Sequence, residues 1–106
     1  MNETSGVSPA FATFLQEASG HAEAWMNAVR GLDEASALDP KTEALAYLAV
    51  LAAVGLQGGV PFHVREAKAA GAARSEVISA VLVGLPAAGQ TVIQALHAAL
   101  SAYDAA

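Results

Sequence analysis

His63 is the side chain in this sequence best suited to acid-base chemistry. The chain has no cysteine, which excludes thiol nucleophiles, thiolate metal sites and disulfides. His63 follows Pro61 near the expected start of a helix, where the partial positive charge of the helix end disfavours an imidazolium ring. We therefore expect a neutral imidazole that accepts or donates one proton near pH 7, as general acid-base catalysis on an enolisable acid requires.

A glycine pair, Gly58 and Gly59, comes just before this helix. The free backbone N–H groups at the start of a helix bind carboxylates readily when glycines come just before the helix. We therefore expect a small organic anion as the ligand. Two alternatives stay open, because a glycine pair can be only a turn and a lone histidine at a helix start can be only a structural hydrogen-bonding residue. The residues expected to form the pocket with His63 are Leu56, Gly58, Gly59, Phe62, Tyr47 and Gln90.

No metal ion, cofactor or nucleic acid is expected as a partner. His21 and His97 have no neighbouring ligand set, and no His, Asp or Glu has metal-site spacing on a face shared with His63. The chain has 5 basic and 10 acidic residues, a formal net charge of −5, and lacks the clustered basic face that binds phosphate backbones.

The composition predicts an all-α fold, because alanine is abundant and β-branched residues are sparse. Ser8-Pro9 and Asp39-Pro40 are typical helix starts, while Gly31 and Gly71 are typical helix ends. The helix over 40–54 is apolar on all faces, which predicts that it is buried on all sides. We expect about six helices around a central αα-hairpin, over residues 9–18, 21–30, 40–54, 60–70, 74–88 and 90–103.

The chain is expected to form one domain over 1–106, with a core over 38–100 and a flexible segment over 1–7. With 55% hydrophobic and 14% charged residues, so small a domain must leave apolar patches in water, which predicts a homo-oligomer. The longest unbroken apolar run of 44–64 is about 13 residues, short of the ~20 that a membrane span needs. The N-terminus has no basic residue followed by an apolar run, so we expect a cytoplasmic protein without a membrane partner.

Several short motifs between Leu38 and Leu100 resemble the carboxymuconolactone decarboxylase family, which includes the alkyl hydroperoxidase D-like proteins. The resemblance implies the alkyl hydroperoxidase D-like helical fold and a trimer or hexamer. The matching pieces are Leu38-Asp39-Pro40-Lys41-Thr42, His63-Val64-Arg65, Gly71, Glu76-Val77 and Gly89.

The sequence departs from the peroxidase members of that family at the residues that do their chemistry. Those members carry Cys-x-x-Cys with a histidine four residues later and a glutamate twelve residues before the first cysteine. Setting His63 on that histidine puts Leu56 and Gly59 at the cysteines and Ala44 at the glutamate. Dithiol peroxidase activity is therefore not expected.

The decarboxylase branch of the family is more similar, because its members commonly lack the dithiol and have His-Val-Arg at this place. The branch tends to show Tyr-Ala-Gly-x-Pro where this chain has residues 87–91, Ala-Ala-Gly-Gln-Thr, and a second histidine of the branch falls near Val83. His63 is thus the main functional residue that the resemblance carries over.

Three functional hypotheses follow. The first is an enzyme that uses His63 for decarboxylation or isomerisation of a small carboxylated or lactone substrate. The second is a protein that binds a small anion in the same pocket without chemical change. The third is a structural oligomer that lost its dithiol and does nothing at this site.

Overall fold

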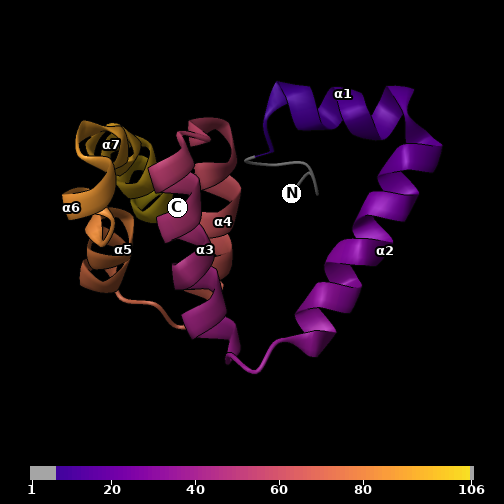
Figure 1. Ribbon diagram of the computed structural model, residues 1–106. Helices are drawn as coiled ribbons and strands as arrows, with labels where there is room; N and C mark the ends of the chain where they lie inside the picture. The colour runs from indigo at the N-terminus through magenta and orange to yellow at the C-terminus, as the bar shows by residue number, and fades with distance from the viewer. Residues whose placement is uncertain (1–6, 106) are drawn as a thin grey trace.

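The computed structural model describes residues 7–105, and all regular structure in that range is helical (Figure 1). The all-α prediction is therefore confirmed. The segment expected to be flexible, 1–7, lies outside the described residues except for Val7. The helices are α1 (Pro9–Glu17), α2 (Ser19–Ala35), α3 (Pro40–Val54), the 3₁₀ turn η1 (Gln57–Gly59), α4 (Val60–Ala69), α5 (Arg74–Leu82), α6 (Leu85–Ala88) and α7 (Gln90–Asp104).

Both predicted Xaa-Pro helix starts are present. The Ser8 hydroxyl accepts a hydrogen bond from the Phe11 N–H at 3.2 Å, and an Asp39 carboxylate oxygen accepts one from the Thr42 N–H at 2.9 Å. Each cap satisfies an amide that the first helical turn leaves without a partner. At its other end α3 stops at Gly55, whose φ of 78° lies in the left-handed region that glycine adopts without strain.

Two predicted helix boundaries are wrong. Gly31 does not end a helix, since α2 runs through it from Ser19 to Ala35; a single interior glycine costs only about 1 kcal/mol relative to alanine. The helix expected over 74–88 is split into α5 and α6. Pro86 accounts for the split, because its ring clashes with the carbonyl four residues earlier, and α5 ends at that residue, Leu82.

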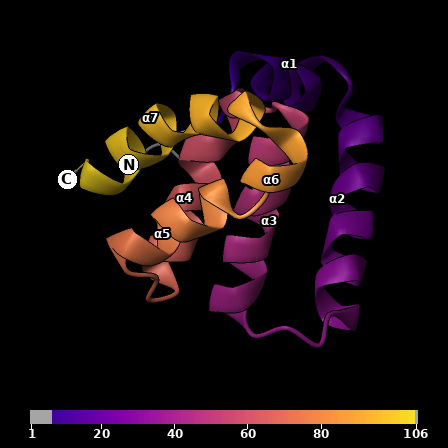
Figure 2. The same ribbon diagram turned by 60° about the vertical axis from the view of Figure 1, so that its left-hand side comes forward.

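Helices α3, α4, α5 and α7 pack together into the core, and Figures 1 and 2 show these four as one bundle. Small residues let the helices approach closely. The fully or nearly fully buried side chains are Leu48, Leu51, Ala52, Val60, Val64, Ala67, Ala72, Val77, Val81, Val92, Ala95, Ala99 and Ala102.

Helix α3 is not buried on all sides, contrary to the prediction from its apolar sequence. Leu48, Leu51 and Ala52 face the core, whereas the other side of the helix is open to solvent. Tyr47 is 46% exposed and Val54 61% exposed.

Helices α1 and α2, residues 9–35, form an arm that stands away from the core (Figure 2). Among α1 and α2 only Ala22 is buried. The arm joins the core at both ends. At one end the short connection from Ser36 to Asp39 leads into α3. At the other end Ser8 lies against Gly58, since a Cβ built on Gly58 would be 3.2 Å from the Cβ of Ser8. The space between the two attachments holds the candidate site.

Within residues 7–105 no helix is long and apolar enough to cross a bilayer.

Candidate acid-base site between the arm and the core

His63 and Glu66 form a hydrogen-bonded pair on α4. The distance from Nδ1 of His63 to Oε1 of Glu66 is 2.6 Å, and the residues are three apart, the spacing that places side chains side by side on a helix. A carboxylate can only accept, so the proton of a neutral ring sits on Nδ1 and Nε2 is left as the basic nitrogen. The pair therefore has the arrangement of a general base with a positioning carboxylate.

Two aromatic rings hold the imidazole in place. The centroid of Tyr47 is 4.5 Å from that of His63, and the ring of Phe62 meets it edge-on at 5.2 Å. The His63 side chain is 28% exposed, so it is supported on several sides and still open on one. Packing of this kind limits the ring to few orientations, which a catalytic base needs.

The open side of His63 faces a cavity of about 810 Å³ between α2 on one side and α3 and α4 on the other. This volume is in the range of small-molecule sites. Most of the lining is apolar, and its larger side chains are Trp25, Val29, Leu32, Leu38 and Tyr47.

The charged residues that line the cavity are all acidic. Asp33, Glu43 and Glu66 line it, whereas no lysine or arginine does so in residues 7–105. Three carboxylates in a partly closed, apolar space repel an anion. The electrostatics therefore favour a neutral ligand over the carboxylate expected from the sequence.

Of the amides expected to bind an anion at the glycine pair, that of Gly59 and that of the next residue, Val60, are not free. The Gly59 N–H donates to the Leu56 carbonyl at 3.1 Å, and the Val60 N–H donates to the carbonyl of Gln57. The turn η1 thus uses these donors within the backbone. Gly59 still lies next to His63, since a Cβ added to it would be 4.0 Å from the ring carbon Cδ2.

Among the predicted pocket residues, Tyr47, Phe62 and Gly59 lie against His63. Of the six, only Tyr47 also lines the cavity; Phe62, Gly59, Leu56, Gly58 and Gln90 do not. Leu56 is 58% exposed at the end of the α3–α4 hairpin, and Gln90 begins α7.

Sequence reasoning missed Glu66 and the arm. Glu66 could have been found, because a carboxylate three residues after a histidine on a helix is a local signal. Trp25 and Leu32 carried no such signal, since they reach the site only through the path of α2. Within the described part of the chain no three His, Asp or Glu side chains gather to hold a metal ion.

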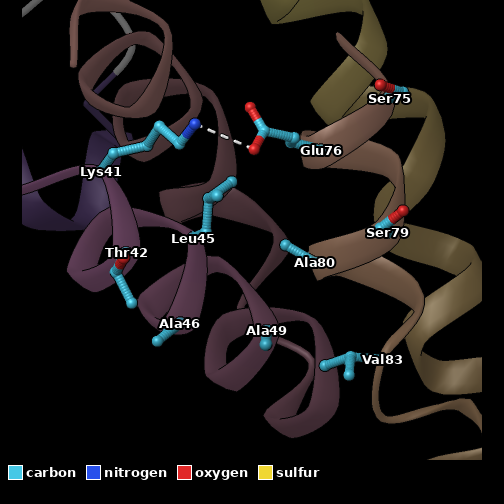
Figure 3. Close-up of a pocket in the computed structure, with 10 residues that line it drawn as sticks. All are labelled: Lys41, Thr42, Leu45, Ala46, Ala49, Ser75, Glu76, Ser79, Ala80 and Val83. Carbon is cyan, nitrogen blue, oxygen red and sulfur yellow. Dashed lines mark ion pairs between the residues drawn. The ribbon is translucent and has the colours of Figure 1, made fainter. Parts of the chain in front are cut away.

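A second, shallow hollow lies between α3 and α5 (Figure 3). Small side chains such as Ala46, Ala49 and Ser79 line it, and an ion pair between Lys41 and Glu76 at 2.9 Å closes one end. The Ala73 N–H and then Lys41 hold the pKa of Glu76 below its usual value. Glu76, the only acid that lines this hollow, is thus a weakened base whose carboxylate is already engaged as a helix cap and ion-pair partner.

The fold and the site together define an all-α protein with a histidine-carboxylate pair in an apolar cavity. The model of the carboxymuconolactone decarboxylase family matches residues 20–102, most of the chain, and the chain belongs to that family. No curated protein and no solved structure shows significant similarity to it. The family match begins inside α2, so it includes most of that helix as well as the core.

Proposed function

We propose that this family member is an acid-base enzyme that moves a proton at a carbon next to the carbonyl group of a small, neutral, lactone-like substrate. The pair formed by His63 Nδ1 and Glu66 Oε1 at 2.6 Å, open to the 810 Å³ cavity, is the observation that carries the proposal. His63 is the catalytic base and Glu66 its positioning residue.

The proposed step uses Nε2 of His63. Its lone pair takes the proton from the carbon next to the carbonyl, and the C–H electrons move onto the carbonyl oxygen to form an enolate. The imidazolium that results keeps its Nδ1–H bond to the Glu66 carboxylate, which stabilises the positive charge. For a β,γ-unsaturated lactone the enolate is a dienolate, and return of the proton to its γ carbon completes an isomerisation with no cofactor.

Tyr47 is the residue best placed to assist. Its ring centroid lies 4.5 Å from that of the imidazole and the residue also lines the cavity, so its hydroxyl is the donor that we propose for the developing enolate oxygen. The acidic lining by Asp33, Glu43 and Glu66 favours the lactone over the carboxylated substrate among the sequence-based alternatives.

The test is deuterium exchange in D₂O, followed by proton NMR, over a panel of lactones and their ring-opened carboxylates. This assay detects removal of the proton next to the carbonyl directly, so the final product of the reaction need not be known. We expect the wild type to accelerate exchange of at least one lactone and the His63→Ala variant to lose about 10²–10⁴-fold of that rate. His97→Ala, which removes an exposed histidine on α7, is the matched control and keeps the wild-type rate.

Two results would contradict the proposal. One is exchange that persists unchanged in His63→Ala. The other is saturable lactone binding by the wild type without exchange, which would support the non-catalytic binding protein instead.

A further inference from the structure

The cavity beside His63 is elongated along the helices that form its walls. Apart from Leu38 in the connection, its lining residues fall within 25–33 of α2, 40–47 of α3, and 63–70 on and just after α4. A helix rises about 1.5 Å per residue, so each wall extends over about 10 Å. A ligand that fills this cavity is therefore long rather than round.

His63 lies at one end of the cavity. Its ring contacts Tyr47, which is the last lining residue of α3. Leu38 and Pro40 lie at the far end, where the connection from α2 enters α3. Because α2 and α3 run in opposite directions from this connection (Figures 1 and 2), Leu32 near the end of α2 belongs to the far end too. The proposed base is thus about 10 Å from the far end.

The α2 wall is apolar over most of this distance. Trp25, Ala28, Val29 and Leu32 line the cavity and are three or four residues apart, so they share one helix face. Trp25 is 56% exposed and Leu32 71% exposed, so both large side chains have apolar surface available to a ligand. Asp33 follows Leu32 and adds a negative charge at the far end.

We propose that the substrate is a lactone with an unbranched alkyl substituent, whose ring lies at His63 and whose alkyl chain extends along α2 towards Leu32. A lactone ring alone leaves most of the 810 Å³ cavity unfilled, whereas the alkyl chain buries its methylenes against the apolar α2 wall. The place of the ring rests on the proposed function. The place of the chain depends only on the shape and lining of the cavity.

Fluorescence tests the place of the chain without any chemical step, because Trp25 is the only tryptophan. The probes are γ-lactones whose substituent grows from methyl in γ-valerolactone through hexyl in γ-decalactone to octyl in γ-dodecalactone. Each added methylene should lower the Kd about two- to fourfold until the chain fills the cavity. The emission of Trp25 should move to shorter wavelength as the chain displaces water from its ring. A Kd that does not fall with chain length overturns the proposal.

Filling the cavity at its middle gives a matched pair of variants. Ala28→Phe puts a ring on the α2 wall between Trp25 and Leu32, so γ-decalactone should bind about tenfold more weakly than to the wild type. Ala24→Phe is the control, because Ala24 is also exposed on α2 but does not line the cavity. It should keep the wild-type dependence of Kd on chain length. Equal chain-length dependence in the wild type and both variants would indicate non-specific binding and overturn the proposal.

The charge of Asp33 predicts that the end of the alkyl chain is uncharged. A γ-lactone whose chain ends in a carboxylate brings a like charge to Asp33. Asp33→Asn should therefore bind this carboxylated lactone about two- to fivefold more tightly than the wild type does. Equal affinity of the two proteins would contradict this position of the chain end.

Deuterium exchange on the same lactones separates this inference from the proposed function. Chain-dependent binding together with exchange supports both. Chain-dependent binding without exchange supports the place of the chain and contradicts the proton transfer. Exchange at a rate that does not depend on chain length, with no chain-dependent binding, contradicts the place of the chain and leaves the proton transfer standing.

Discussion

At the scale of single residues, the candidate chemistry depends on one contact. His63 and Glu66 share a helix face, so the helix α4 alone places their side chains within reach of each other. What makes the pair a candidate site is its surroundings: the rings of Tyr47 and Phe62 on two sides and an apolar cavity on the third. The carboxylate removes any ambiguity about which ring nitrogen is basic.

Glu66→Gln tests the positioning role. The amide keeps the shape of the side chain but removes the charge that stabilises the imidazolium, so we expect the exchange rate to fall about 10–100-fold with a nearly unchanged KM. Exchange kinetics over a range of substrate concentrations separate kcat from KM. Glu23→Gln, on the polar side of α2, should leave both constants unchanged. A raised KM with full kcat in Glu66→Gln would instead place Glu66 in substrate binding.

At the scale of elements, ionic contacts fasten the ends of the core helices. Arg74 at the start of α5 makes two hydrogen bonds to Asp104 at the end of α7, at 2.9 and 3.0 Å. Lys68 of α4 donates to the Tyr103 carbonyl at 2.7 Å and lies 4.7 Å from the centroid of that residue's ring. These contacts join segments about thirty residues apart and hold α7 against α4 and α5.

The Arg74–Asp104 pair predicts a pH dependence of stability. The Arg74 guanidinium lowers the pKa of Asp104 from its usual 3.8, because it hydrogen-bonds the charged carboxylate. A lowered pKa in the folded state contributes stability above the unfolded value, and this contribution is lost as the pH falls through the folded one. Asp104→Asn should therefore lower the Tm by about 1–4 °C at pH 7.

The difference between Asp104→Asn and the wild type should shrink as the pH falls from 4 towards 2. The difference in Tm between the two proteins is measured by thermal unfolding, followed by circular dichroism at several pH values. Both carboxylate oxygens are engaged by Arg74, so the variant loses a two-point contact. A difference that stays constant from pH 7 to 2 would show that the charge of Asp104 does not contribute.

At the scale of the whole molecule, the chain belongs to the family but lacks the residues that do the chemistry of its peroxidase members. The family model covers residues 20–102, so the chain has the family's helical domain. It nevertheless has no cysteine, and Leu56 and Gly59 stand where the peroxidase members have theirs. The shared domain therefore carries different chemistry, or none, at the same helix hairpin.

Purified metal-free protein should not consume an alkyl hydroperoxide above the background rate, because no thiolate is present to attack the peroxide. Consumption of tert-butyl hydroperoxide with dithiothreitol as the reductant is the measurement. The Leu56→Cys/Gly59→Cys double variant is a reference with thiols at the family positions, and Gly59 accepts a Cβ at ordinary contact distances. Protein-dependent turnover by the wild type would contradict the prediction.

Local patterns in the sequence determined most of the element structure. Ser8-Pro9 and Asp39-Pro40 start helices and Gly55 ends one, because caps and left-handed glycines act within a few residues of the chain. The absence of cysteine alone decided which nucleophiles the protein lacks. The His63–Glu66 pair belongs to this local class too, because its two residues are three apart on one helix.

Only the tertiary structure decided what surrounds His63. The arm carries Trp25 and Leu32 to the cavity from a segment about thirty to forty residues away, and Asp33 and Glu43 add charge from two helices. The neutral substrate that we propose follows from the three carboxylates that line this cavity, which no local spacing encodes. The open face of α3 was decided in the same way, because burial depends on which helices meet and apolar periodicity cannot say which ones do.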